Sequence, residues 1–387
     1  MAPQNLLELL RSRTVVDCDT MEFEVAKSLG PFTDCTSNQA IAFFELQKPE
    51  NKTLLEETAE TTQKLLRTQD YQDVKFSELA VEVAMVKLQL AIASVVTGFV
   101  HVQTNPYHSY GTEEMIQDAR RIISIFRHLD SGFDTNRICL KIPSTWEGLQ
   151  ACKFLEREGI RTLATTLFSI EQAALAGEVQ CTYVAPYVNE LKVHFDAGFT
   201  DTNKAHQLCF EIQQYYSKNN LRTKVLPASL TNIDEIMTLA GVDHITIAPA
   251  LLRDLAATAV EGYEVKSLFD GDGREESQST ALEFDNDESL WRIRFTRSVK
   301  GEAERKLSQA INIFCDMQTQ LEAMIAQSIA IVQYKICEVR SSLESSRNTN
   351  VIEANSKRIS TRPTRKGSVV NLVFRDLYES NQGAKSE

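Results

Sequence analysis

Hydrophobic residues gather in short runs, and longer segments of helical periodicity separate these runs. The runs are rich in β-branched residues and nearly continuous, which is typical of parallel strands that are covered on both faces. The pattern predicts eight strands, at residues 14–20, 32–38, 98–105, 137–144, 161–169, 181–188, 223–229 and 244–252.

The segments between these runs predict helices at residues 79–92, 113–129, 145–158 and 232–240. We expect Thr231 to be the N-cap of the last of these. The long segment 39–97 must hold more than one helix. Because strand and helix alternate eight times, the expected fold is an α/β (β/α)8 TIM barrel rather than an open sheet.

The C-terminal third has a different pattern. Residues 266–288 are polar and predict a surface loop, whereas residues 299–345 have apolar positions near a 3.6 period and predict a long helix. Residues 346–387 contain a basic stretch and then the apolar run VVNLVF, which fits a docking strand or, as we favour, a loose tail. We therefore expect a barrel with a C-terminal helix over residues 1–326, followed by a helical extension and a mostly disordered tail over 327–387.

Composition and charge narrow the class of protein. The 387 residues carry a formal net charge of −12, which argues against nucleic acid and anionic membranes as partners. Eight cysteines without a CxxC pair indicate reduced thiols in a cytoplasmic protein. We expect no secretory signal at the N-terminus and no membrane span, because no run of 18 apolar residues occurs. The six histidines lack ligand spacing and no dinucleotide loop is present, so we expect neither metal nor organic cofactor.

Lys141 lies inside the apolar run ICLKIP. Burying a charged amine is costly, so such a lysine favours its neutral form, which is the form that attacks carbonyls. The alternative is a lysine that points outward between the helices, and the pattern alone does not separate the two.

Further polar residues fall at the expected ends of strands, where the active sites of such barrels lie. Asp19 is a candidate general acid/base, and Asp17 has the same strand parity. Thr36 and Asn38 share a face and suit substrate hydroxyls, although capping is the alternative for both. The remaining candidates, each with a structural alternative, are Gln103, Thr165 and Tyr187.

Several of these residues belong to segments that resemble one known family. The run KIPSTWEG, from Lys141 to Gly148, resembles the segment around the Schiff-base lysine of the transaldolase family. Further similar segments, in the family's order, are Asp19-Thr20, DCTSN at 34–38, SYGTE at 109–113, LFS at 167–169, ITIAPAL at 245–251 and Leu290-Trp291 with the helix after it. The resemblance covers roughly residues 5–326.

The resemblance implies a mechanism. Lys141 would form a Schiff base with a ketose, and Asp19 would take the proton of the C4 hydroxyl as the C3–C4 bond breaks. The dihydroxyacetone unit would remain as an enamine and pass to an aldehyde. Thr36, Asn38 and Ser229 would hold its hydroxyls, and Thr165 would position the water used in Schiff-base formation.

Five positions depart from the family's pattern. Gln103 stands where the family has a glutamate that partners the catalytic water, and Tyr187 stands where it has a phenylalanine. Both residues resemble the fructose-6-phosphate aldolase branch, which releases free dihydroxyacetone or adds it to aldehydes. Glu190, Thr231 and Leu163 replace two phosphate-binding arginines and an asparagine.

The loss of the arginines weakens the expected binding of a sugar phosphate, because a carboxylate and a hydroxyl cannot replace two bidentate clamps. Thr231 remains a candidate for substrate binding, and Lys192 offers only a point charge. Three functions therefore stay open: a transaldolase, an aldolase-like lyase on an unphosphorylated substrate, and a non-catalytic barrel with a binding role. Retention of Lys141 and Asp19 favours an enzyme that acts on small sugar substrates. The long helix could form the interface of a homodimer or cover the barrel.

Overall fold

The computed structural model describes residues 2–271 and 282–328. Eight parallel strands form the predicted barrel: β1 (Val15–Asp19), β2 (Cys35–Thr36), β3 (Val100–Gln103), β4 (Ile138–Pro143), β5 (Arg161–Leu167), β6 (Tyr183–Pro186), β7 (Lys224–Val225) and β8 (His244–Ile247). Each strand from β1 to β6 pairs with the next one along the chain, and β1 also pairs with β8. The N–H of Thr246 donates to the carbonyl of Pro227 at 3.2 Å, which joins β8 to the end of β7.

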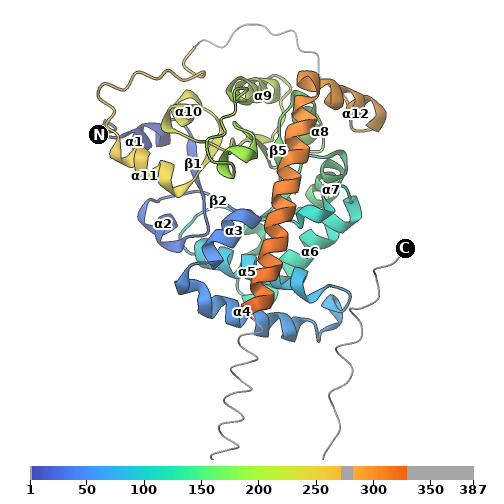
Figure 1. Ribbon diagram of the computed structural model, residues 1–387. Helices are drawn as coiled ribbons and strands as arrows, with labels where there is room; N and C mark the ends of the chain where they lie inside the picture. Colours follow the sequence, from blue (N-terminus) through green and yellow to red (C-terminus); the bar gives the residue numbers. More distant parts are fainter. Residues whose placement is uncertain (1, 272–281, 329–387) are drawn as a thin grey trace, which may run out of the picture. The chain divides into compact units, whose positions relative to one another are not determined.

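Helices surround these strands (Figure 1). They are α1 (Leu6–Arg11), α2 (Phe23–Ser28), α3 (Gln39–Leu46), α4 (Lys52–Leu65), α5 (Phe76–Ala93), α6 (Thr112–Leu129), α7 (Trp146–Arg157), α8 (Ile170–Glu178), α9 (His206–Lys218), α10 (Ile233–Thr238), α11 (Pro249–Ala257) and α12 (Glu288–Arg297). Short 3-10 helices lie at η1 (Pro49–Asn51), η2 (Gln69–Tyr71), η3 (Pro106–His108), η4 (Thr135–Arg137), η5 (Leu191–His194) and η6 (Ser298–Gly301). The four predicted helices correspond to α5, α6, α7 and α10, and the segment 39–97 holds α3, α4 and α5.

Two of the predicted boundaries that differ from the structure have a clear local cause. The last strand ends at Ile247 rather than at residue 252, because Pro249 begins α11 and its fixed φ and missing N–H suit the first turn of a helix. The N-cap of α10 is Asn232 rather than Thr231. The side chain of Asn232 accepts the N–H of Glu235 at 3.0 Å.

The long C-terminal helix is helical from residue 302 to residue 328, where the described residues end. It starts three residues later than predicted, because Val299 and Lys300 have φ values of 48° and 57° and separate it from α12. Residues 272–281 of the predicted loop lie outside the described residues, as do the rest of the predicted helix and the tail from 329 onward.

The core combines the strands with the inner faces of the helices. All seven cysteines in the described residues are free thiols and six of them are buried, as predicted, while Cys337 lies outside that part of the chain. Among the described helices, none is both long and apolar enough to cross a membrane.

The C-terminal helix crosses the end of the barrel at which the strands finish (orange in Figure 1). Near its start, the amide of Gln309 donates to Glu190, which lies beyond β6, at 3.0 Å. Further along, the hydroxyl of Thr319 lies 2.7 Å from that of Tyr107, which lies beyond β3. The helix therefore covers part of the barrel mouth.

Candidate active site

Lys141 points into the barrel. The residue is only 2% exposed, and its Nζ donates to the carbonyl of Ser37 at 3.3 Å. Ser37 follows β2, and β3 lies between β2 and β4, so the amine reaches across the inside of the barrel. This orientation excludes the alternative of a lysine that projects outward between the helices.

Asp19 belongs to a hydrogen-bonded row on three neighbouring strands. The hydroxyl of Thr36 on β2 donates to Oδ1 of Asp19 at 2.7 Å and lies 2.6 Å from the hydroxyl of Thr246 on β8. A hydroxyl has one proton, so Thr246 must donate to Thr36 when Thr36 donates to Asp19. Asp19 is partly exposed while both threonines are buried, so the row presents a carboxylate at the barrel mouth.

Asp17 has the same parity as Asp19 but a different environment. It is fully buried and accepts hydrogen bonds from the N–H of Asp34 and from Nδ1 of His244, each at 2.8 Å. Burial raises the pKa of Asp17 to about 6, although its bond to His244 acts in the opposite direction. These contacts give Asp17 a structural role.

The residues around Asp17 form a buried polar layer below Lys141. Asp34 accepts hydrogen bonds from the N–H of Phe99 at 2.7 Å and from Nε2 of His101 at 3.1 Å. Ligand-type atoms of Asp17, Asp34 and His244 lie within 4.8 Å of one another. Each of the four oxygens of these two carboxylates has a hydrogen-bond partner, so the layer is explained by its own contacts.

Gln103 lies beside Lys141 on the neighbouring strand. The two residues are partners in the β3–β4 ladder, so their side chains face the same side of the sheet. Gln103 is 2% exposed, and neither of its amide atoms has a hydrogen-bond partner among the described residues. A buried amide without partners is costly, which makes it available to a polar ligand at the lysine.

On the other side of Lys141, β5 supplies Leu163 and Thr165. Leu163 is the ladder partner of Lys141 and is fully buried, so this wall of the site is apolar. The hydroxyl of Thr165 donates to that of Tyr187 at 3.4 Å. Both are buried, and the ring of Tyr187 lies edge-on to that of Phe168 at 5.9 Å between centroids.

The other predicted site residues have local partners. The Oδ1 of Asn38 accepts the N–H of Ile41 at 3.0 Å and caps α3, as its structural alternative anticipated. Thr231 is exposed, and its hydroxyl donates to Glu235 at 2.9 Å. Ser229 is half-buried beyond β7, and its Oγ lies 2.9 Å from Nε2 of His194.

The loop after β6 carries charges that are paired with other residues. Glu190 is 4% exposed, and its Oε2 lies 2.9 Å from Nη2 of Arg305 and accepts a hydrogen bond from Gln309. The Nζ of Lys192 lies 3.1 Å from Asp196 within the same loop. No local sequence pattern marks Thr246, His194, Arg305 and Gln309, because their contacts join distant segments.

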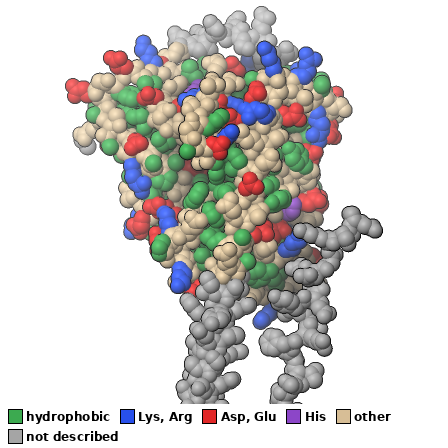
Figure 2. Space-filling model, in the orientation of Figure 1, with side chains coloured by type: hydrophobic (Ala, Val, Ile, Leu, Met, Phe, Trp, Pro, Cys, Tyr) green, Lys and Arg blue, Asp and Glu red, His purple; other side chains and the backbone are tan. Residues whose placement is uncertain are grey.

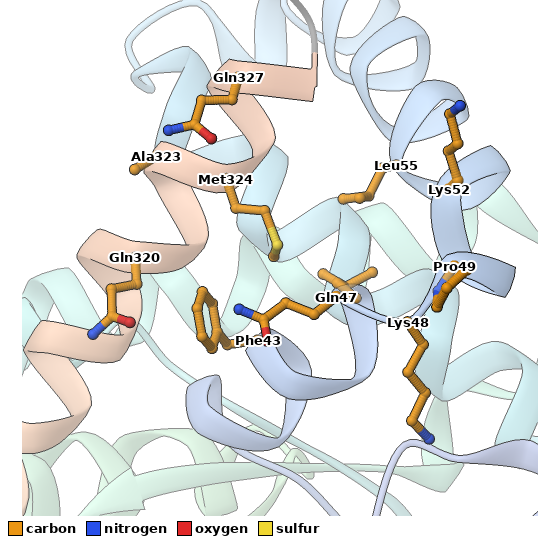
Figure 3. A pocket seen from close by; sticks show the side chains of 11 residues that line it. Phe43, Gln47, Lys48, Pro49, Lys52, Leu55, Gln320, Ala323, Met324 and Gln327 are labelled. Carbon is orange, nitrogen blue, oxygen red and sulfur yellow. The ribbon is translucent and has the colours of Figure 1, made fainter.

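A groove of about 570 Å³ lies apart from this site, between the C-terminal helix and the segment from α3 to α4 (Figure 3). Its walls include Phe43, Leu55 and Met324, with Lys48 and Lys52 at one edge. None of the predicted site residues lines it. The groove therefore adds nothing to the chemistry at Lys141.

These features define a (β/α)8 barrel whose interior holds a buried lysine, with a carboxylate from β1 at the same end. A profile of the Transaldolase/Fructose-6-phosphate aldolase family matches residues 16–325. A transaldolase of Vibrio cholerae serotype O1 (strain ATCC 39315 / El Tor Inaba N16961) is 31% identical over 332 residues, which cover 84% of this chain and 99% of the relative. The corresponding identities are 32% for a transaldolase of Vibrio vulnificus (strain CMCP6), with the same coverage, and 29% for one of Methylobacillus flagellatus, over 84% of this chain and 99% of the relative. The chain belongs to the transaldolase/fructose-6-phosphate aldolase family.

Proposed function

We propose that this protein is a Schiff-base enzyme that transfers a dihydroxyacetone unit from a ketose donor to an aldehyde acceptor. The observation that carries the proposal is the amine of Lys141, which is 2% exposed and lies inside the barrel. Asp19 supplies a partly exposed carboxylate at the ends of the strands. Membership of the family and the similarity to proteins named transaldolase support the same activity.

In the proposed reaction, the neutral amine of Lys141 adds to the ketose carbonyl and water leaves, which gives an imine. Asp19 accepts the proton of the C4 hydroxyl, and the electrons of the C3–C4 bond pass to the imine, so that an enamine remains and an aldehyde departs. The enamine carbon then bonds to the carbonyl carbon of the acceptor, whose oxygen takes the proton from Asp19. Water finally hydrolyses the imine and frees Lys141.

Neighbouring polar groups have supporting roles in this proposal. Gln103 orients the water used to make and break the imine, because an amide can hold water but cannot take its proton. Thr165 and Tyr187 help to position that water through their hydroxyls. Thr36 and Asn38 hold the hydroxyls of the transferred unit, whereas Ser229, half-buried beyond β7, is a substrate contact at the rim. Thr231 remains a predicted contact at the rim, although its hydroxyl is bound to Glu235.

A second candidate function is the cleavage or addition of free dihydroxyacetone, with an unphosphorylated partner. The charge distribution in the loop beyond β6 favours this second function. Each lysine or arginine of that loop, and of the stretch of the C-terminal helix that faces it, contacts a carboxylate. These pairs are Lys192–Asp196, Lys204–Glu235, Arg305–Glu190 and Lys306–Asp201. On the face in Figure 2, basic and acidic side chains are likewise interspersed. A phosphate there would have to compete with a protein carboxylate for every cation.

Borohydride trapping with dihydroxyacetone tests the imine directly. Reduction should add the mass of the reduced dihydroxyacetone adduct to the peptide that contains Lys141. The Lys141→Arg variant, which keeps the charge but removes the nucleophilic amine, should gain no mass. If the wild-type protein gains none with dihydroxyacetone or with any ketose donor, the protein is a binding barrel instead of an enzyme.

A coupled assay separates transfer from cleavage. With a ketose donor alone, a lyase releases dihydroxyacetone continuously, whereas a transferase stops after one turnover until an aldehyde is added. Transfer that requires an acceptor supports the first candidate. Continuous release without an acceptor supports the second.

A further inference from the structure

His194 lies at the rim of the candidate site and has no role in the reaction proposed above. It ends η5, eight residues after Pro186 closes β6, and is solvent-exposed. Its Nε2 lies 2.9 Å from Oγ of Ser229, and it is within electrostatic range of Asp19. The imidazole is thus held at the same end of the barrel as the carboxylate.

The backbone conformation of Ser229 fixes the position of the hydroxyl that contacts His194. Ser229 has a φ of 59°, in the left-handed region that residues other than glycine, asparagine and aspartate seldom adopt. Its carbonyl accepts hydrogen bonds from the backbone N–H of Asn189 at 3.2 Å and from the Nδ2 of the same residue at 2.9 Å. Such conformations persist only where the surroundings determine them, and they concentrate at ligand sites.

The segments that follow four of the strands lack a permanent cation that could bind a phosphate. The segments that follow β3, β4, β5 and β7, at residues 104–111, 144–150, 168–172 and 226–232, contain no lysine or arginine. Among the described residues, the cations of the loop beyond β6 and of the facing helix are Lys192, Lys204, Arg305 and Lys306, and each of them contacts a carboxylate. A neutral imidazole and a hydroxyl can each donate and accept one hydrogen bond, which matches the hydroxyl of an uncharged sugar.

We propose that His194 and Ser229 form a recognition pair for a hydroxyl of the acceptor, which selects an uncharged hydroxyaldehyde. The incoming hydroxyl takes the place of the direct bond between the two side chains, donating to one and accepting from the other. His194 is then a specificity-determining residue rather than a catalytic one. This inference rests on the Schiff-base reaction proposed above.

The test compares three acceptors of equal carbon number with one ketose donor. Glyceraldehyde carries hydroxyls, propanal carries none, and glyceraldehyde 3-phosphate adds a charge. The wild-type protein should have its highest kcat/KM with glyceraldehyde. The His194→Phe variant should lower the ratio of kcat/KM for glyceraldehyde over propanal by about 10- to 100-fold. His128→Phe, which changes an exposed histidine on α6, is the matched control and should leave the ratio unchanged.

Ser229→Ala gives an independent measurement if the phenylalanine variant does not fold. It should lower the same ratio, and the double variant should be no worse than the more affected single variant, because both remove one recognition pair. Equal losses for glyceraldehyde and propanal would overturn the inference, as would a wild-type preference for the phosphorylated acceptor. Trapping of the wild-type protein at Lys141 separates the two proposals: a trapped imine with an unchanged acceptor ratio rejects only the recognition pair.

Discussion

The Nζ of Lys306 lies 2.7 Å from Oδ2 of Asp201, and the two side chains are only 7% and 3% exposed. Lys306 also donates to the carbonyl of Asn203 at 2.8 Å, and Asp201 accepts the N–H of Glu190 at 2.8 Å. One buried ion pair therefore joins the C-terminal helix to the loop that carries His194. Through this loop, the helix helps to shape the rim of the site.

Replacing Lys306 by methionine should lower the free energy of unfolding by about 3 kcal/mol or more, because it leaves the Asp201 carboxylate buried without its partner. Urea denaturation measures the change. Lys300→Met, at an exposed lysine six residues earlier, is the control and should change the free energy by less than about 0.5 kcal/mol. The double change Asp201→Asn with Lys306→Met should recover part of the loss. Equal stabilities for Lys306→Met and the control would mean that the pair contributes little.

Asp201 also predicts a dependence of stability on pH. Burial alone would raise the pKa of Asp201, but hydrogen bonds from Lys306 and from the N–H groups of Glu190 and Asn203 lower it below the ordinary value of 3.8. A lowered folded-state pKa gives stability that is present above about pH 4 and is lost as the pH falls through the folded value. The difference in unfolding free energy between the wild-type protein and Asp201→Asn should be constant from about pH 7 to 5 and shrink below about pH 4. Urea denaturation at several pH values measures it, and a difference that stays constant down to about pH 2.5 would contradict the assignment.

The barrel was predictable because its strands are covered on both faces and so appear as continuous apolar runs. The ends of the strands were less predictable, because a strand extends only as far as its residues pair with a neighbouring strand. Residues 32–38 predicted a strand, yet only Cys35–Thr36 is paired as β2. The extent of β7, Lys224–Val225, was overestimated for the same reason. Proline at position 249 was a visible signal for the end of β8.

The part of the site that lies on strands was partly predictable, because strand parity places Asp19, Thr36, Gln103 and Lys141 on the inner face. The hydrogen bond between Thr36 and Thr246 joins positions that are 210 residues apart, and no local pattern reveals it. The same holds for Arg305, which reaches Glu190 from a helix beyond the barrel. Sequence patterns identify the face of an element, whereas contacts between loops depend on the whole fold.

Asp19→Asn should separate imine formation from bond cleavage. The asparagine keeps the size of the side chain but cannot take the C4 proton, so kcat for transfer should fall by about 100- to 10,000-fold. Trapping of dihydroxyacetone at Lys141 should persist, because that step breaks no carbon–carbon bond. Steady-state kinetics and borohydride trapping with mass spectrometry measure the two steps.

Asp17→Asn is the matched control for that experiment, since Asp17 lies on the same face of the same strand. Its two acceptor bonds, to Asp34 and His244, are structural, and asparagine preserves only one of them. We expect a loss of about 1–3 kcal/mol in unfolding free energy with transfer nearly unchanged. A larger effect on kcat from Asp17→Asn than from Asp19→Asn would exchange the roles of the two carboxylates.

Tyr187→Phe should remove one hydroxyl from the site with little effect on stability. The ring keeps its edge-on contact with Phe168, at 5.9 Å, so the free energy of unfolding should change by less than about 1 kcal/mol. The hydroxyl that accepts from Thr165 is lost, and if both groups position the water of imine formation, the rate of trapping at Lys141 should fall about tenfold, the equivalent of about 1.4 kcal/mol for one hydrogen bond. Thr165→Val should have a similar effect, and the double variant should add little to either single change, because the two hydroxyls act as one unit. Fully additive losses, or a normal trapping rate in Tyr187→Phe, would show that Thr165 and Tyr187 do not act together at the lysine.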